Sequence, residues 1–497
     1  MTKQIVFLAM VGLLFMSWQL SISANPSTID STYSIKGTVG GAGHHLEGFR
    51  IFAKGFKETG LYPLNPETME MEVYDTYRMG DRGKMFLLWF DSLFKQDTWS
   101  YNRANAILFI GALLVFFYSF YLKNYKIFAV VSAILIGSSS FQLYETYMNN
   151  NIFSIVISTT LLTMGLNAFA FKNESERLKF FHCLLALTTG LLLGFIKHIR
   201  TEPVTICISV IALYLLINRL TLKSRLLLVL CLIVGYSCSN FSTTYYLDRL
   251  HDKTSDYVSK NGGDVYEGHR RNSHLLWHSI YCGYGDYASA LGYRWDDYSA
   301  YTYALSILRK NDPHIWPEFD EHSGQKKLSD YFINSDRKYK IKLEDRDDYE
   351  SILKEKIFYD IASHPGLFIN LYLKRVFNSL VHTSGVQLYL PKLAKIDLNF
   401  YGFGFISILA ALIAILKRDS FAIKMLLFTI PLLSTSLLIY SKNSYEFYSI
   451  YPTIGVSIIL VYIFDHIFNK KLLGTIKSSK IMPGVPKNDG NTRDEPC

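Results

Sequence analysis

The chain has 497 residues, 49% of them hydrophobic and 15% aromatic, and its mean hydropathy is +0.14. This is too apolar for a chain built of soluble domains alone, so a lipid bilayer is expected to be part of its solvent. The formal net charge of +9 would suit nucleic acid. However, the lysines and arginines are spread out, and several lie in short loops between apolar runs, which argues against a nucleic-acid partner.

Apolar runs long enough to cross a hydrocarbon core recur along the sequence. They lie at 5–21, 105–122, 127–144, 152–171, 180–196, 203–218, 226–241, 400–416, 421–440 and 447–468. The expected fold class is therefore an α-helical polytopic membrane protein with about ten transmembrane helices. The first run also has features of a signal peptide, with Lys3 before it and Ser21 and Ser23 after it. We expect it to be retained, because the topology requires it.

The positive charges predict an orientation. Lysines and arginines gather in alternate connections and after the last run, at 123–126, 172–179, 219–225, 417–418 and 470–471. By the positive-inside rule this side is cytoplasmic, so both termini are predicted to lie inside. The predicted location is that of a multi-pass protein of a bacterial inner (plasma) membrane.

This topology divides the chain into six parts. They are a first transmembrane helix or signal anchor (1–23), a first extracytoplasmic loop with a juxtamembrane amphipathic helix (24–104), transmembrane helices two to seven (105–241), a large and mainly helical extracytoplasmic loop domain (242–399), transmembrane helices eight to ten (400–468) and a cytoplasmic tail (469–497).

One short outer connection breaks the charge rule. It reads Lys197-His198-Ile199-Arg200-Thr201-Glu202. Cations at the outer edge of a membrane need an anionic partner, so Lys197 and Arg200 are predicted to contact a phosphate. Anionic lipid headgroups, or pairing with Glu202, are the alternatives.

The first outer loop contains a short amphipathic pattern that ends before Gly60 and predicts a helix lying on the membrane surface. Glu47 stands at the start of this pattern, directly after His44 and His45. A carboxylate at that point suits either a helix cap or a general base. The histidines and the carboxylate also suit a divalent cation, but nothing in their spacing specifies a metal site.

The second outer loop is rich in aromatic, acidic and basic residues. Histidines at 274 and 278, Trp277 and Asp286 are followed by Arg294, Asp296 and Asp297. Such side chains stack on sugar rings and bind hydroxyls, although packing of a small domain would explain them nearly as well. Residues 311–350 are strongly charged and predict a solvated surface. An amphipathic helix is expected from 363 onward, and the six cysteines give neither a disulfide framework nor a zinc spacing.

The order of these parts resembles the GT-C superfamily of membrane glycosyltransferases. In that superfamily an outer juxtamembrane helix begins with an acidic residue, the next helix opens with an Arg, a second outer turn carries aromatic and acidic residues, and a Gly-rich helix ends in Lys or Arg. The similar segments here are 45–60, 98–104, 144–151 and 194–203. Where a pair of acidic residues is frequent in the superfamily, this chain has the single Glu47.

The resemblance implies transfer of a sugar from a polyprenyl-phosphate carrier to an envelope glycan, lipid or protein acceptor on the extracytoplasmic face. Glu47 would be the catalytic base, with Glu145, Asp75 and Asp81 in reserve, and Lys197 and Arg200 would hold the donor phosphate. The candidate substrate-binding residues are His44, His45, Arg103, Glu145, Trp277, His278, Arg294, Asp296 and Asp297. A divalent cation is compatible with the sequence, but no metal ligands are assigned.

Three other classes of protein share parts of this layout. An O-antigen-type polysaccharide polymerase and a non-catalytic membrane scaffold remain open as alternatives. A transporter is disfavoured, because the sequence has no internal repeat and almost no charge at the centres of the predicted spans.

Overall fold

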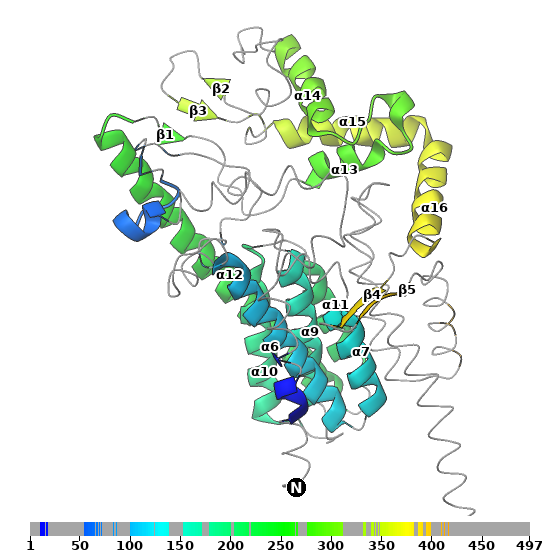
Figure 1. Ribbon diagram of the computed structural model, residues 1–497. Helices are drawn as coiled ribbons and strands as arrows, with labels where there is room; N and C mark the ends of the chain where they lie inside the picture. The colour runs from blue at the N-terminus through cyan, green and yellow to red at the C-terminus, as the bar shows by residue number, and fades with distance from the viewer. Residues whose placement is uncertain are drawn as a thin grey trace, which may run out of the picture.

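The computed structural model describes most of residues 54–71, 100–138, 153–170, 178–217, 220–263, 276–311 and 346–381, with shorter pieces near 10–17, 83–86, 265–266, 332–343, 386–398 and 409–416. These residues are mostly helical (Figure 1). The helices are α6 (Ser100–Leu122), α7 (Lys126–Ser138), α9 (Phe153–Ala170), α10 (Phe180–Ile196), α11 (Pro203–Leu215), α12 (Leu222–Lys260), α13 (Leu276–Tyr284), α14 (Asp297–Asn311), α15 (Tyr349–Ser363) and α16 (Pro365–Val381), with a 3₁₀ turn at Ser289–Leu291.

Five short strands complete the described secondary structure: β1 (Val265–Tyr266), β2 (Phe332–Ile333), β3 (Tyr339–Ile341), β4 (Val386–Leu390) and β5 (Ala394–Leu398). The first sheet has the order β1-β3-β2, with β1 parallel to β3 and β2 antiparallel to it. Strands β4 and β5 form an antiparallel pair in which Val386 lies opposite Leu398. Since the strands are two to five residues long, helices carry the architecture.

Each predicted apolar run between 105–122 and 226–241 coincides with one of the helices α6 to α12. Among the described residues, α12 alone is both long and apolar enough to cross a membrane, and shorter apolar helices occur at Ala106–Leu122, Ile155–Ala168, Phe180–Ile196 and Val204–Leu215. Of the first run, residues 10–14 and 16–17 are helical, and of the run 400–416, residues 409, 412 and 416. The predicted runs 421–440 and 447–468 lie outside the described residues.

Helices α6, α7, α9, α10, α11 and the first half of α12 form one bundle whose interior is apolar. Phenylalanines from α6 and α7 pack at its centre, with ring centres of Phe116 and Phe120 4.7 Å apart and those of Phe120 and Phe128 4.9 Å apart. The outside is apolar as well. Large exposed hydrophobic side chains there include Ile107, Leu108, Val130, Ile134, Leu184, Ile208, Leu226, Leu230 and Ile233. A helix bundle in water normally places polar residues on this face.

The closest contact in the bundle joins α10 to α12 through glycines. A Cβ added at Gly190 would lie 2.1 Å from the Leu232 carbonyl oxygen, and one at Gly235 would lie 2.2 Å from that of Leu187. Gly194, one turn after Gly190, faces the Tyr236 carbonyl oxygen at 2.4 Å in the same way. Small residues at this spacing let two helix backbones approach closely, a pattern typical of membrane helix pairs.

Helix α12 does not end where the apolar run ends. The expected boundary between a membrane span and a loop, at 241/242, lies inside this helix, which continues as a partly polar helix to Lys260. Figure 1 shows it leaving the bundle at an angle and reaching β1. Its N-terminus is capped by the Thr221 side chain, which accepts a hydrogen bond from the Ser224 backbone N–H.

Residues 54–71, in the predicted first outer loop, pack on this second half of α12. The Tyr62 backbone N–H donates to Thr254 Oγ1 at 3.0 Å, and residues 54–59, at the end of the predicted amphipathic helix, are helical. The shared core consists of Tyr62, Leu64, Met71, Leu247, Leu250 and Val258. The two predicted outer loops therefore contact each other.

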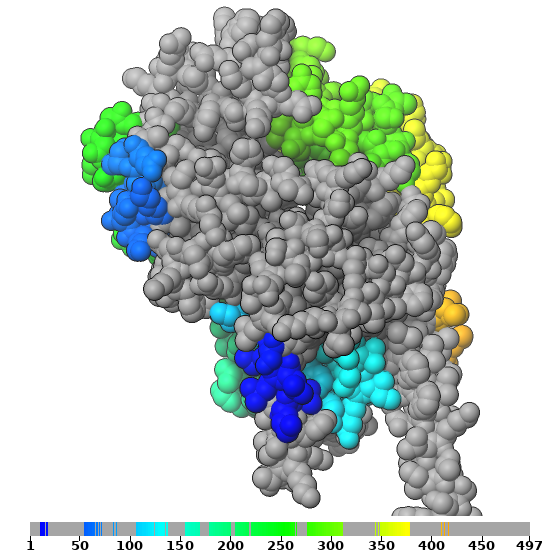
Figure 2. Space-filling model, in the orientation of Figure 1, coloured from blue at the N-terminus to red at the C-terminus, as the bar shows by residue number. Residues whose placement is uncertain are grey.

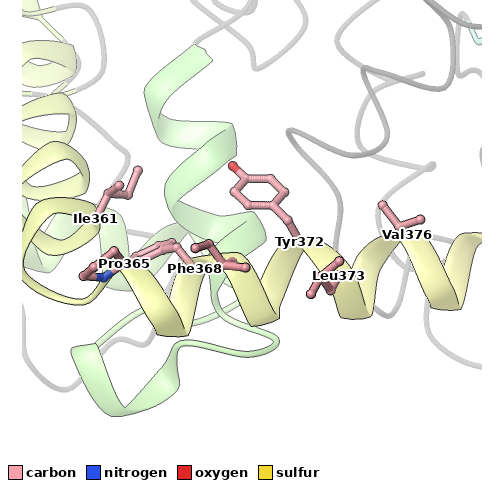
Figure 3. A pocket seen from close by; sticks show the side chains of 7 residues that line it. Ile361, Pro365, Phe368, Tyr372, Leu373 and Val376 are labelled. Atoms are coloured by element: carbon pink, nitrogen blue, oxygen red, sulfur yellow. The ribbon is translucent and has the colours of Figure 1, made fainter.

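A separate core unites α13, α14, α15 and α16, which lie above the bundle in Figures 1 and 2. It is rich in tyrosine, since Tyr281, Tyr284, Tyr293 and Tyr349 are all buried. The predicted amphipathic helix is confirmed as α16, with Pro365 at its first position. Residues of α16, with Ile361 of α15, line a pocket shown in Figure 3: Ile361, Pro365, Phe368, Ile369, Tyr372, Leu373 and Val376.

The glycine contact between α10 and α12 yields a stability prediction. In Gly190→Ala the new methyl group would overlap the α12 backbone, and overpacking of this kind costs about 1–3 kcal/mol. Gly111, on α6, has nothing within 4 Å of its would-be Cβ, so Gly111→Ala is the matched control and is expected to leave stability unchanged or raise it by about 1 kcal/mol. Thermal unfolding of the purified proteins in detergent measures the difference. An equal effect of both substitutions would contradict the packing.

Candidate functional site

The charge-rule exception at Lys197 forms a tight turn at the end of α10. The backbone N–H of His198 donates to Phe195 O at 3.1 Å, and that of Ile199 donates to Ile196 O at 2.8 Å. The half-buried Lys197 ammonium donates to Asn240 Oδ1 of α12 at 3.3 Å. His198 Nε2 lies 3.3 Å from the Asn240 carbonyl oxygen. The turn is thus fixed to the neighbouring helix at the point where α12 changes from apolar to polar.

Residues 83 and 86, in the predicted first outer loop, lie against this turn. The Gly83 N–H donates to His198 O at 2.8 Å, and a Cβ at Gly83 would also lie 2.8 Å from that oxygen. Three residues later, the Phe86 ring packs 4.9 Å from Phe195 and 5.9 Å from Tyr246. The structure therefore places Gly83 and Phe86 against the Lys197 turn. A site built from both segments requires such a contact.

Several predicted site residues lie outside the described residues. They are His44, His45, Glu47, Asp75, Asp81, Glu145, Arg200 and His274. Arg103 lies in the first turns of α6, where the structure describes the backbone but not its side chain. The predicted meeting of Glu47 with Lys197 and Arg200 consequently stays a prediction.

Among the predicted residues of the second loop, Asp296 and Asp297 lie near His278, which is buried on α13. Its Nδ1 lies 2.6 Å from the Tyr349 hydroxyl oxygen, and its Nε2 lies 3.0 Å from Asp297 Oδ1. The imidazole also stacks on Tyr301, with ring centres 5.4 Å apart and planes at 29°. These contacts hold the imidazole ring in one orientation.

Cys282 joins the same group, although the sequence analysis assigned it no role. It follows His278 by one helical turn on α13, and its Sγ lies 3.7 Å from His278 Nε2. The thiol donates to the Asp296 carbonyl oxygen at 3.5 Å, and burial raises the pKa of this thiol. The i, i+4 spacing of His278 and Cys282 was the available signal, since such residues share one face of a helix.

The Asp296 side chain has a local structural role. Its Oδ1 accepts a hydrogen bond from the Ser299 N–H at 2.6 Å, at the start of α14. This is the contact expected of a helix cap. Asp297, the next residue, is left to face His278.

The start of α13 is held by a carboxylate from another helix. Glu350 Oε2 accepts hydrogen bonds from the N–H groups of Leu276 and Trp277, both at 3.0 Å. Glu350 Oε1 accepts one from the His278 N–H at 2.9 Å. The first N–H groups of a helix have no acceptor within the helix. The Glu350 carboxylate supplies these acceptors, and its negative charge suits a helix N-terminus. Glu350 had been placed in a stretch expected to be solvated surface.

The other two predicted residues of this loop point elsewhere. The Trp277 ring packs against Phe358 of α15, 5.4 Å away, with the Lys354 ammonium 5.7 Å from it. Arg294 is exposed. Its backbone lies close to Gly285, so that a Cβ added at Gly285 would lie 2.2 Å from the Arg294 carbonyl carbon. His278, Asp296 and Asp297 therefore lie close together. Trp277 packs against α15, and Arg294 lies on the surface.

The structure thus places predicted site residues in two locations, the Lys197 turn on the bundle and the His278 group in the α13–α16 unit. The first offers a cation beside apolar helices, which can hold a phosphate. The second offers a nitrogen, a sulfur and an oxygen within a few ångströms of one another. No family model, curated protein or solved structure matches the chain.

The Glu350 contact predicts a loss of stability on substitution. In Glu350→Ala the three N–H groups of α13 lose their acceptor, and the loss of a charged cap costs about 1–2 kcal/mol. Glu355, exposed on the same helix α15, provides the control Glu355→Ala. Thermal unfolding followed by tyrosine and tryptophan fluorescence should show a lower midpoint for the first variant alone. Equal midpoints would mean that the carboxylate contributes nothing to α13.

Proposed function

We propose that this chain is a multi-pass membrane glycosyltransferase of the GT-C kind. It transfers a sugar from a polyprenyl-phosphate carrier to an envelope glycan, lipid or protein acceptor on the extracytoplasmic face. The proposal includes about ten membrane spans, both termini in the cytoplasm and location in a bacterial inner membrane.

The surface of the bundle supports the membrane part of the proposal. Large apolar side chains cover its exterior as well as its interior, and lipid tails accept such a surface where water does not. The glycine contact between α10 and α12 supports it too, because helix association in lipid relies on close backbone packing. On α16, Ile369 and Leu373 are each 63% exposed, as suits a helix lying along a membrane surface.

The main support for the proposed transfer reaction is the contact of the first outer loop with the Lys197 turn. A polyprenyl tail has to stay in lipid while its phosphate and sugar meet a polar acceptor, so the site belongs at the edge of an apolar bundle. Lys197 lies at such an edge, at the end of α10, and Gly83 of the first loop donates a hydrogen bond to the adjacent residue at 2.8 Å. The predicted loop that contains Glu47 therefore reaches the Lys197 turn at Gly83, which supports the assignment of both segments to one site.

In the proposed reaction, Glu47 removes the proton from an acceptor hydroxyl as its oxygen attacks the anomeric carbon of the donor sugar. The bond between that carbon and the phosphate oxygen breaks, and the electron pair leaves with the polyprenyl phosphate. Lys197 and Arg200 stabilise the negative charge that develops on the leaving phosphate.

Removal of the Lys197 charge is expected to weaken donor binding. A hydrogen bond to a charged group contributes about 1.5–3 kcal/mol, so Lys197→Ala should raise the donor KM by about 10-fold to 100-fold. Arg200→Ala is expected to act in the same direction. The measurement is transfer of labelled sugar in proteoliposomes from a panel of polyprenyl-phosphate-linked hexoses and pentoses.

The matched control is Lys179→Ala, which removes an exposed lysine at the opposite end of α10. It should leave the donor KM unchanged, because that end lies on the predicted cytoplasmic side. An unchanged KM in both Lys197→Ala and Arg200→Ala would remove the phosphate assignment and favour contact with lipid headgroups.

The base assignment is tested separately. Glu47→Gln keeps the size of the side chain but cannot accept the proton, and loss of general-base catalysis costs about 10²-fold to 10⁴-fold in kcat. Donor binding, measured by competition with unlabelled polyprenyl phosphate, should persist. Full transfer activity in Glu47→Gln would contradict the assignment of Glu47 as the base. A ladder of repeat products formed by the wild type would instead identify a polysaccharide polymerase.

A further inference from the structure

Three different metal-binding atoms meet in the α13–α16 unit. His278 Nε2 lies 3.0 Å from Asp297 Oδ1 and 3.7 Å from Cys282 Sγ, and one ligand atom from each of the three residues lies within 4.8 Å of the others. His278 and Cys282 come from consecutive turns of α13, and Asp297 begins α14. A junction of two helices therefore assembles the group.

The imidazole is oriented as a metal ligand would be. In protein metal sites, the ring nitrogen that does not bind the ion is usually held by a hydrogen bond. Here Nδ1 lies 2.6 Å from the hydroxyl oxygen of the buried Tyr349. A proton on Nδ1, donated to that oxygen, would leave the Nε2 lone pair facing Cys282 and Asp297.

We propose that His278, Cys282 and Asp297 bind a divalent transition-metal ion, with Zn²⁺ as the preferred metal. Nitrogen, thiolate and carboxylate ligands suit this ion, whose bonds to them are about 2.0–2.3 Å long. Two ligands of a tetrahedral ion with such bonds lie roughly 3.3–3.5 Å apart, close to the 3.0 Å and 3.7 Å that separate His278 Nε2 from Asp297 Oδ1 and Cys282 Sγ. On binding, Cys282 gives its proton to the solvent and coordinates as thiolate.

The site would have one coordination position left for a water or a substrate oxygen. Three protein ligands and an open fourth position are typical of catalytic zinc, whereas structural zinc is enclosed by four. The open position would face solvent on the side of Asp297, whose side chain is 63% exposed while that of His278 is 6% exposed. A hydroxylated ligand such as a glycan fits this chemistry. The inference does not depend on the sugar transfer proposed above.

A hydrogen-bonded network without metal is the competing account of the same contacts. In that account Asp297, His278 and Tyr349 form a polar chain, and the Cys282 thiol only donates to the Asp296 carbonyl. The two accounts differ over the thiol, because serine preserves a hydrogen bond but is a poor ligand for Zn²⁺. Cys282→Ser therefore separates them.

The experiment uses the full chain purified in detergent, stripped with a chelator and titrated with Co²⁺ as a spectroscopic substitute for Zn²⁺. We expect about one equivalent of Co²⁺ to bind, with a thiolate-to-cobalt charge-transfer band in the near ultraviolet, and Zn²⁺ to displace it. Cys282→Ser should lose the band. Asp297→Asn should weaken Co²⁺ binding at least tenfold, and Tyr349→Phe by about 10-fold to 100-fold.

Two control variants remove similar groups elsewhere. Cys238→Ser deletes an exposed thiol on α12, and Glu355→Gln neutralises an exposed carboxylate on α15; both should bind Co²⁺ as the wild type does. An unchanged band in Cys282→Ser, or no binding by the wild type below about 1 mM, would overturn the site. If Cys282→Ser does not fold, the test rests on Asp297→Asn, which alters an exposed side chain. An unchanged Co²⁺ affinity in that variant would also overturn the proposal.

Discussion

The close contact of α10 with α12 is the constraint on which the rest of the structure depends. Glycines at 190, 194 and 235 let the two backbones touch, with would-be Cβ atoms only 2.1–2.4 Å from carbonyl oxygens of the facing helix. Because α12 continues beyond the bundle, its angle against α10 determines where the polar segments lie. The same contact sets the register that places Asn240 beside Lys197. A shift of one helical turn would separate the cation from its partner and the first loop from its support.

Helix α12 links the apolar and polar parts of the molecule. Its first half packs in the bundle and its second half carries the first outer loop through Tyr62 and Thr254. This arrangement keeps a polar loop close to an apolar surface without a flexible connection between them. The lipid-linked donor proposed above would need such a place, since its tail and its head require different surroundings.

The sequence predicted the bundle helices well, because apolar runs of this length are typical of helices and too long for buried strands. It did not predict that α12 continues past 241, since a hydropathy window registers the change in polarity and not the unbroken helical spacing of Leu247, Leu250, Thr254 and Val258. His278 and Asp297, both chosen from the sequence as substrate-binding candidates, contact each other although 19 positions separate them, and their role stays a prediction.

The partners of α13 were not predictable in the same way. Tyr349 and Glu350 lie 71 and 72 positions from His278, and no local pattern indicates contacts at that distance. Glu350 lies at the end of a charged stretch, where single carboxylates usually face water. Cysteine spacing alone does not indicate Cys282, because the proposed ligands are a histidine and a cysteine on one helix face and an aspartate on another helix.

The central claim is that the Lys197 turn and the first outer loop together hold the phosphate of a polyprenyl-linked donor. Photo-crosslinking of the purified protein in lipid with a polyprenyl phosphate that carries a photoreactive group beside the phosphate tests it most directly, with the labelled peptides mapped by mass spectrometry. Labels within residues 83–86 and 195–200, lost on addition of excess unmodified polyprenyl phosphate, are the predicted result. Labels confined to the exterior of the bundle, or insensitive to that competitor, would contradict the claim.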